Sequence, residues 1–81
     1  MKINIATKRE TEQAFKLLCK SMPEGSYCNL QLEIIRYASN DEIEVKYSAY
    51  CGGNKVRLVN SDTPMKAVNR LIERNEDDTA T

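Results

Sequence analysis

The chain of 81 residues contains no histidine, and its three cysteines are Cys19, Cys28 and Cys51. Because no two cysteines form a C-x-x-C motif and imidazole is absent, the usual Cys/His zinc pattern is excluded. An odd number of cysteines at these spacings favours reduced thiols in a cytosol. We expect Cys28 and Cys51 to pack as small apolar residues, and the strand register decides whether a disulfide between them is geometrically allowed.

Long apolar runs, charge excess and catalytic motifs are also absent. No segment approaches membrane-spanning length, and residues 1–8 are too short and polar for a signal peptide. Lysine plus arginine and aspartate plus glutamate both total twelve, so the overall charge does not mark the chain as a polyanion binder. A P-loop, a nucleotide fingerprint and a nucleophile elbow are all missing. The sequence predicts a cytoplasmic protein with no catalytic residues, no metal, no cofactor and no membrane contact.

What is present is a stretch, residues 27–60, in which apolar and polar residues alternate in three runs. A period of two is typical of a half-buried antiparallel sheet. The residues predicted to share the apolar face are Cys28, Leu30, Leu32, Ile34, Ile43, Val45, Tyr47, Ala49, Cys51, Val56 and Leu58.

Two turns join the three runs. Residues 38–42 connect the first two, and pairs whose numbers sum to 79 place Glu33 opposite Lys46 and Cys28 opposite Cys51, whereas a sum of 81 is the alternative. The glycines of Cys51-Gly52-Gly53-Asn54 predict a tight second hairpin, because such turns need positive φ at their central residues. The third strand should then end near Asn60.

One helix is predicted before the three strands in the chain, and a second helix after them. Thr7 and Glu10 have the spacing of a capping box, and the amphipathic run that follows extends to about Lys20. Thr63-Pro64 opens a second helix, with a hydroxyl at the cap and proline at the first helical position. Residues 1–75 should form a single domain, and the polar residues 76–81 a disordered acidic tail.

The predicted architecture is α+β, in the order α-β-β-β-α, with a three-stranded antiparallel meander and both helices on one face. The other face is then left uncovered. Tyrosine and arginine on it are residue types favoured at protein interfaces, which predicts contact with a protein partner or with a second copy of the chain as a homodimer. The residues predicted to make this contact are Ile35, Tyr37, Lys46, Tyr50, Arg57 and Val59.

The order of the elements resembles that of the double-stranded-RNA-binding domain. In that family, basic residues at the start of the second helix grip phosphates, and Lys66 and Arg70 occupy roughly that place. The family's Lys-Lys-x-x-Lys run shrinks to these two residues, and the acidic loop 38–42 replaces its Gly-Pro-x-His type motif. The resemblance implies an alternative function, nucleic-acid binding through Lys55, Arg57, Lys66 and Arg70.

A second resemblance is to small accessory proteins of phages and prophages. It is carried by the short chain, by Ser48-Ala49-Tyr50 before the two glycines, and by the helix that begins at Thr63-Pro64 and contains Ala67 and Leu71. Several such proteins bind and block a host enzyme or defence complex. The resemblance implies a viral protein that binds or inhibits a host protein in the host cytoplasm.

Overall fold

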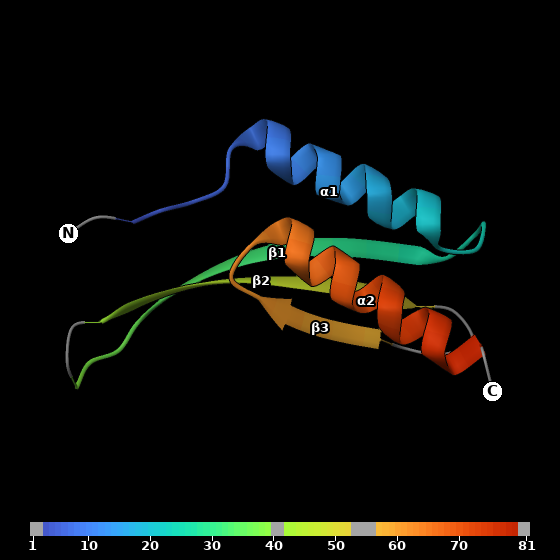
Figure 1. Cartoon of the computed structure of the whole chain (residues 1–81). Helices are drawn as coiled ribbons and strands as arrows, with labels where there is room; N and C mark the ends of the chain where they lie inside the picture. The colour runs from blue at the N-terminus through green and yellow to red at the C-terminus, as the bar shows by residue number, and fades with distance from the viewer. Residues whose placement is uncertain (1–2, 40–41, 53–56, 80–81) are drawn as a thin grey trace.

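Two helices and one sheet make up the computed structural model of the chain, which describes residues 3–39, 42–52 and 57–79, with the backbone alone for residues 57 and 76–79 (Figure 1). The elements in chain order are α1 (Lys8–Ser21), β1 (Tyr27–Arg36), β2 (Ile43–Gly52), β3 (Arg57–Ser61) and α2 (Pro64–Thr79). The sheet is antiparallel in the order β1-β2-β3, and both helices pack on the same face of it. The predicted α+β meander with two helices on one face is confirmed.

Both helices begin where the capping residues predict. The Thr7 hydroxyl accepts a hydrogen bond from the backbone N–H of Glu10 at 3.1 Å, and the Thr63 hydroxyl accepts one from Lys66 at 3.2 Å. Each bond satisfies an N–H of the first turn that has no partner within the helix. After α1 the chain reverses through Gly25, whose φ of +86° is a conformation that favours glycine.

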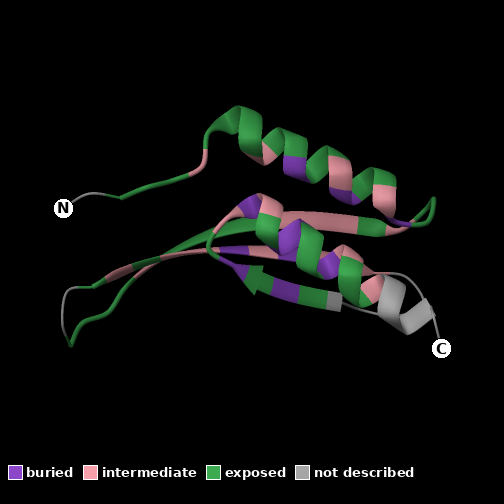
Figure 2. Ribbon diagram, viewed as in Figure 1, coloured by how far each residue is buried: buried purple, intermediate pink, exposed green. Residues whose placement is uncertain are grey.

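The core lies between the two helices and the sheet (Figure 2). Its buried members come from every element except β1: Ala14, Leu18, Met22, Tyr47, Ala49, Cys51, Val59, Ala67, Val68 and Leu71. Tyr47 also ties the N-terminal lead-in to the sheet, because its hydroxyl accepts the N–H of Ala6 at 2.9 Å. Residues 3–7 form no strand.

The first hairpin has the predicted register. Glu33 lies opposite Lys46 and Cys28 opposite Cys51, so the paired numbers sum to 79. The loop end of this hairpin projects beyond the helices (Figure 1). Leu32 and Ile34 are on the helix side of β1, yet each is 45% exposed, because the helices do not reach this part of the sheet.

The predicted phase of the third strand is wrong. Val59 pairs with Ala49 and is only 8% exposed, so it belongs to the core and not to the open face. Leu58 pairs with Tyr50 on the opposite face, which is the face predicted for Val59. The paired numbers of β2 and β3 have an even sum, as in Ala49 opposite Val59, whereas a two-residue Gly52-Gly53 turn requires an odd sum. Gly53 and the rest of that turn lie outside the described residues.

Helix α2 is longer than predicted. Its backbone remains helical through Thr79, whereas the sequence predicts a disordered tail over residues 76–81. Once a helix has been nucleated and packed, each further residue adds one backbone hydrogen bond at little cost. The packed residues Val68 and Leu71 anchor α2, and the four polar residues extend it.

Candidate protein-binding face

The side of the sheet that faces away from the helices carries no covering element among the described residues (Figure 1). It is formed by the residues that alternate with the core-facing ones on each strand. We call it the open face. Its described members are Tyr27, Asn29, Gln31, Glu33, Ile35, Glu44, Lys46, Ser48, Tyr50, Leu58 and Asn60, with Tyr37 directly after β1.

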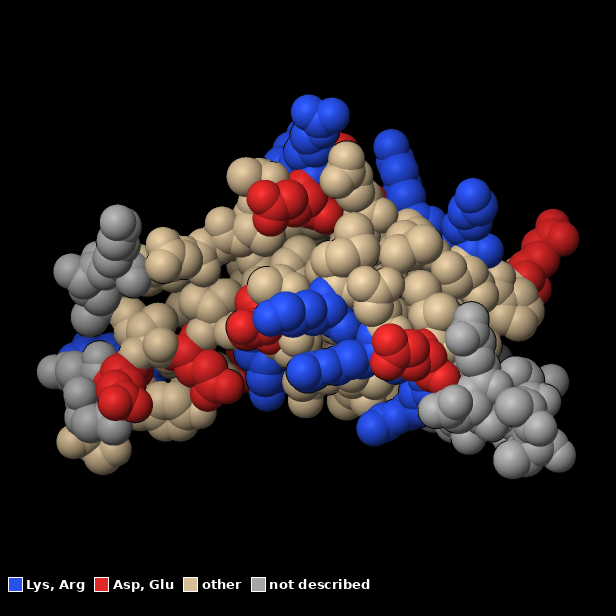
Figure 3. Space-filling model, in the orientation of Figure 1, with Lys and Arg blue, Asp and Glu red and all other residues tan. Residues whose placement is uncertain are grey.

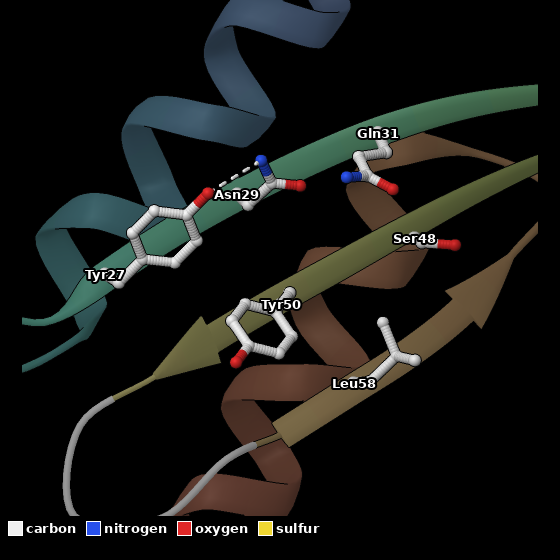
Figure 4. Close-up of a pocket in the computed structure, with 6 residues that line it drawn as sticks. All are labelled: Tyr27, Asn29, Gln31, Ser48, Tyr50 and Leu58. Carbon is white, nitrogen blue, oxygen red and sulfur yellow. Dashed lines mark hydrogen bonds between the residues drawn. The ribbon is translucent and has the colours of Figure 1, made fainter.

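One end of the open face is aromatic, and its described side chains are uncharged. Tyr27 and Tyr50 pack edge to face, with ring centroids 5.8 Å apart and an angle of 75° between the ring planes (Figure 4). Leu58 lies opposite Tyr50 on β3. Tyr27 is 61% exposed and Leu58 53% exposed, so much of this apolar surface remains in contact with water.

These side chains surround a shallow depression of about 320 Å³, which we call the aromatic site (Figure 4). Its described lining residues are Tyr27, Asn29, Gln31, Ser48, Tyr50 and Leu58. The amide of Asn29 donates a hydrogen bond to the Tyr27 hydroxyl at 3.4 Å, and the Ser48 hydroxyl donates to the Asn60 side chain at 2.6 Å. Among the described residues the lining contains no carboxylate, imidazole or thiol, so its chemistry is apolar contact combined with neutral hydrogen bonding.

The other end of the open face is charged. Glu33 lies opposite Lys46, and the Tyr37 hydroxyl donates a hydrogen bond to the Glu44 carboxylate at 2.5 Å. This hydrogen bond, followed by the negative charge of Glu44, raises the pKa of Tyr37 above its usual value. Ten residues separate Tyr27 from Tyr37, which places the two ends about 33 Å apart along an extended strand.

The predicted partner-binding residues therefore do not form one cluster within a single copy. Ile35, Tyr37 and Lys46 lie at the charged end, and Tyr50 lies in the aromatic site. Val59 is in the core, and the side chain of Arg57 lies outside the described residues, although its backbone pairs with Cys51.

The prediction missed two residues of the aromatic site, Tyr27 and Leu58. Tyr27 could have been found from the sequence, because it shares the two-residue period of Asn29 and Gln31. Leu58 could not, because its face depends on the length of the second turn.

The residues of the nucleic-acid alternative lie elsewhere. Lys66 and Arg70 are exposed on α2, one turn apart. The Lys66 ammonium is 3.6 Å from the Asp62 carboxylate and lowers the pKa of Asp62, and the Arg70 guanidinium donates to the Asn60 carbonyl at 3.2 Å. In Figure 3, lysine and arginine side chains on this side of the molecule alternate with acidic ones. Lys55 lies outside the described residues, and phosphate binding stays a prediction.

None of the three cysteines is in a disulfide. Burial, followed by the neighbouring Cys19 thiol, raises the pKa of the Cys28 thiol. In the described part of the chain, no group of three or more histidine, cysteine, aspartate or glutamate side chains is arranged to hold a metal ion. Within the same residues, neither helix is long and apolar enough to span a membrane.

Comparisons with protein-family models, with curated proteins and with solved structures found no match to this chain.

Proposed function

We propose that the chain is a non-catalytic interaction protein that binds a partner protein through its open face, with the aromatic site at the centre of the contact. The observation that carries the proposal is the packing of the exposed Tyr27 against Tyr50, beside the exposed Leu58, on a face that no described element covers. Tyrosine is enriched at the residues that dominate interface energies, because it combines a large apolar ring with a hydroxyl.

The lining of the aromatic site indicates the chemistry of the partner. Asn29, Gln31 and Ser48 offer neutral donors and acceptors around the two rings and Leu58. A partner suited to this lining presents an apolar side chain surrounded by backbone or amide groups. Charges are concentrated at the far end, where Glu33 and Lys46 can orient the partner without contributing much to its affinity.

The resemblance to phage accessory proteins suggests where to find the partner. A bacterial host protein that is bound or inhibited in the host cytoplasm is the first candidate. Homodimerisation is compatible with this function, because a second copy and a partner can occupy different parts of the sheet.

The test begins with capture of proteins from a bacterial lysate by the immobilised chain, followed by affinity measurement with the purified partner. We expect the double variant Tyr27→Ala/Tyr50→Ala to weaken binding at least tenfold, since truncation of one interface hot spot typically costs about 2 kcal/mol. Circular dichroism checks that the variant is folded. Unchanged affinity in this variant would refute the proposal.

A matched double variant tests the nucleic-acid alternative. Lys66→Ala/Arg70→Ala removes two of the exposed cations of α2 and leaves the open face intact. We expect this variant to keep its affinity for the protein partner. If it instead abolishes a retention of duplex RNA or DNA that falls steeply with salt, the chain binds phosphates and the alternative replaces the proposal.

A further inference from the structure

The two outer edges of the sheet differ in whether their backbone groups have partners. On β3, the outward carbonyl of Asn60 accepts a hydrogen bond from Arg70 at 3.2 Å, and that of Leu58 accepts one from Arg74 at 3.4 Å. Both arginines come from α2, so this helix satisfies the two carbonyls that another strand would need. On the edge formed by β3, which is five residues long, these two outward carbonyls are therefore already hydrogen-bonded.

The edge formed by β1 is ten residues long. The N–H of Tyr37 bonds to the carbonyl of Glu42, so in this hairpin the odd-numbered residues direct their backbone groups toward β2. The even-numbered residues Leu30, Leu32 and Ile34 then direct theirs outward. No described residue outside the sheet donates to or accepts from these groups. They are a ready template for a further strand.

The side chains of this edge that lie on the helix side of the sheet are apolar. Leu32 and Ile34 are each 45% exposed on the helix side. Beside them, Phe15 of α1 and Leu30 of β1 line an apolar hollow of about 280 Å³. Phe15 is part of the apolar stripe of α1, yet it is 40% exposed, because nothing in the described chain fills the hollow. Apolar surface on both the edge and the neighbouring helix indicates an interface.

We propose that two copies of the chain pair through β1, antiparallel, about a two-fold axis that passes next to Leu32. Leu32 then lies opposite Leu32 of the second copy, and Leu30 lies opposite Ile34 of the second copy. This brings Ile34 of the second copy next to the hollow beside Phe15. The exposed Leu32 and Ile34 and the half-buried Leu30 are thus packed against one another, and the two sheets join into one of six strands.

Charge selects this register over a neighbouring one. A shift of one residue toward the hairpin loop places Glu33 opposite Glu33 of the second copy, and like charges directly opposed destabilise a sheet. With the axis at Leu32, Glu33 instead faces the neutral Gln31. In this register the apolar residues of β1 lie opposite apolar residues, and Glu33 lies opposite a neutral residue. Because the sequence of β1 itself provides this match, we infer that the strand bound at this edge is β1 of a second copy.

The dimer also completes the aromatic site. With the axis at Leu32, Tyr37 of the second copy lies next to Tyr27, and Ile35 of the second copy lies next to Asn29. The predicted partner-binding residues Ile35 and Tyr37, which are remote from Tyr50 in one copy, join it across the axis. This consequence rests on the proposed function, whereas the dimer itself does not.

The first test is the mass in solution, measured by sedimentation equilibrium over a range of concentrations. We expect wild type to approach twice the chain mass of 9.2 kDa. Leu32→Lys places two ammonium groups face to face and should give a folded monomer. The matched control is Leu58→Lys, which makes the same change at a similarly exposed residue on β3 and should remain dimeric. A monomeric wild type, or a dimer that persists in Leu32→Lys, overturns the proposal.

The second test is disulfide cross-linking in a chain with Cys19→Ser, Cys28→Ser and Cys51→Ala. Opposed residues of a hydrogen-bonded antiparallel pair have Cα atoms about 5.5 Å apart, which is within the range that a disulfide spans. Leu32→Cys should therefore give a covalent dimer on oxidation, and Leu58→Cys should not. If Leu32→Cys fails to cross-link while this background is dimeric, the β1 pairing is wrong. Neither test involves the partner protein, so failure here leaves the proposed function standing.

Discussion

The face that each residue of β3 presents can be tested by comparing two alanine substitutions. Val59→Ala removes two carbon groups from a side chain that is 8% exposed. At about 0.8 kcal/mol for each buried group, the transfer cost is about 1.6 kcal/mol, and the cavity left behind raises it to about 2 kcal/mol. Leu58→Ala acts on a side chain that is already 53% exposed, so the same constant gives a cost of about 1 kcal/mol with no closed cavity.

Urea denaturation followed by circular dichroism measures both costs. For a chain this small, a denaturant dependence of about 1 kcal/mol per molar predicts a fall in midpoint of about 2 M for Val59→Ala and about 1 M for Leu58→Ala. A lysine pair enlarges the contrast: we expect Leu58→Lys to fold and Val59→Lys to be unfolded, because the latter buries an unpaired charge. If the order of either pair is reversed, β3 has the opposite phase and Leu58 does not belong to the aromatic site.

Three further predictions concern the turn after α1, one tyrosine and the thiols. Gly25→Ala should destabilise the fold by about 1 kcal/mol in the same denaturation assay, because its φ of +86° strains any residue with a Cβ, although no atom lies close enough to clash. In an NMR titration, Tyr37 should ionise above the usual pH of about 10, and Glu44→Gln should lower the pKa of Tyr37. The hydrogen bond from Tyr37 to Glu44 stabilises the fold below a pH of about 10, and this stabilisation is lost as the pH rises through the raised pKa of Tyr37. A Tyr37 pKa that does not respond to Glu44→Gln would contradict the contact. In native protein, iodoacetamide should modify the exposed Cys19 first and the buried Cys51 last, as peptide mass spectrometry can check; equal rates would show that Cys51 is accessible.

Much of the fold can be predicted from local signals. Thr7 and Thr63 mark the helix starts, because a hydroxyl that accepts a first-turn N–H needs only a few neighbouring residues. Two long alternating runs predict that the paired numbers of the first hairpin have an odd sum, since only an odd sum keeps both apolar faces on one side; alternation alone does not separate the observed sum of 79 from 81. The apolar stripes of the two helices and the single apolar face of the sheet also predict that both helices cover that face, because each apolar surface is buried against another.

The third strand could not be predicted in the same way. It is only five residues long, and each of its two faces offers an apolar residue, so alternation favours neither. The choice is made by packing against α2, which buries Val59 together with Val68 and Leu71. Leu58 consequently lies beside Tyr50 in the aromatic site, at the end of the first hairpin that is away from its loop.

The arginines that α2 places on β3 limit how far the protein can polymerise. A subunit whose sheet has two edges with unpaired backbone groups can add a further subunit at each edge and grow into a fibril. Here Arg70 and Arg74 donate hydrogen bonds to the outward carbonyls of β3. If two copies pair through β1 as proposed, the joined sheet ends in β3 on both sides, and these arginines oppose the addition of a further copy.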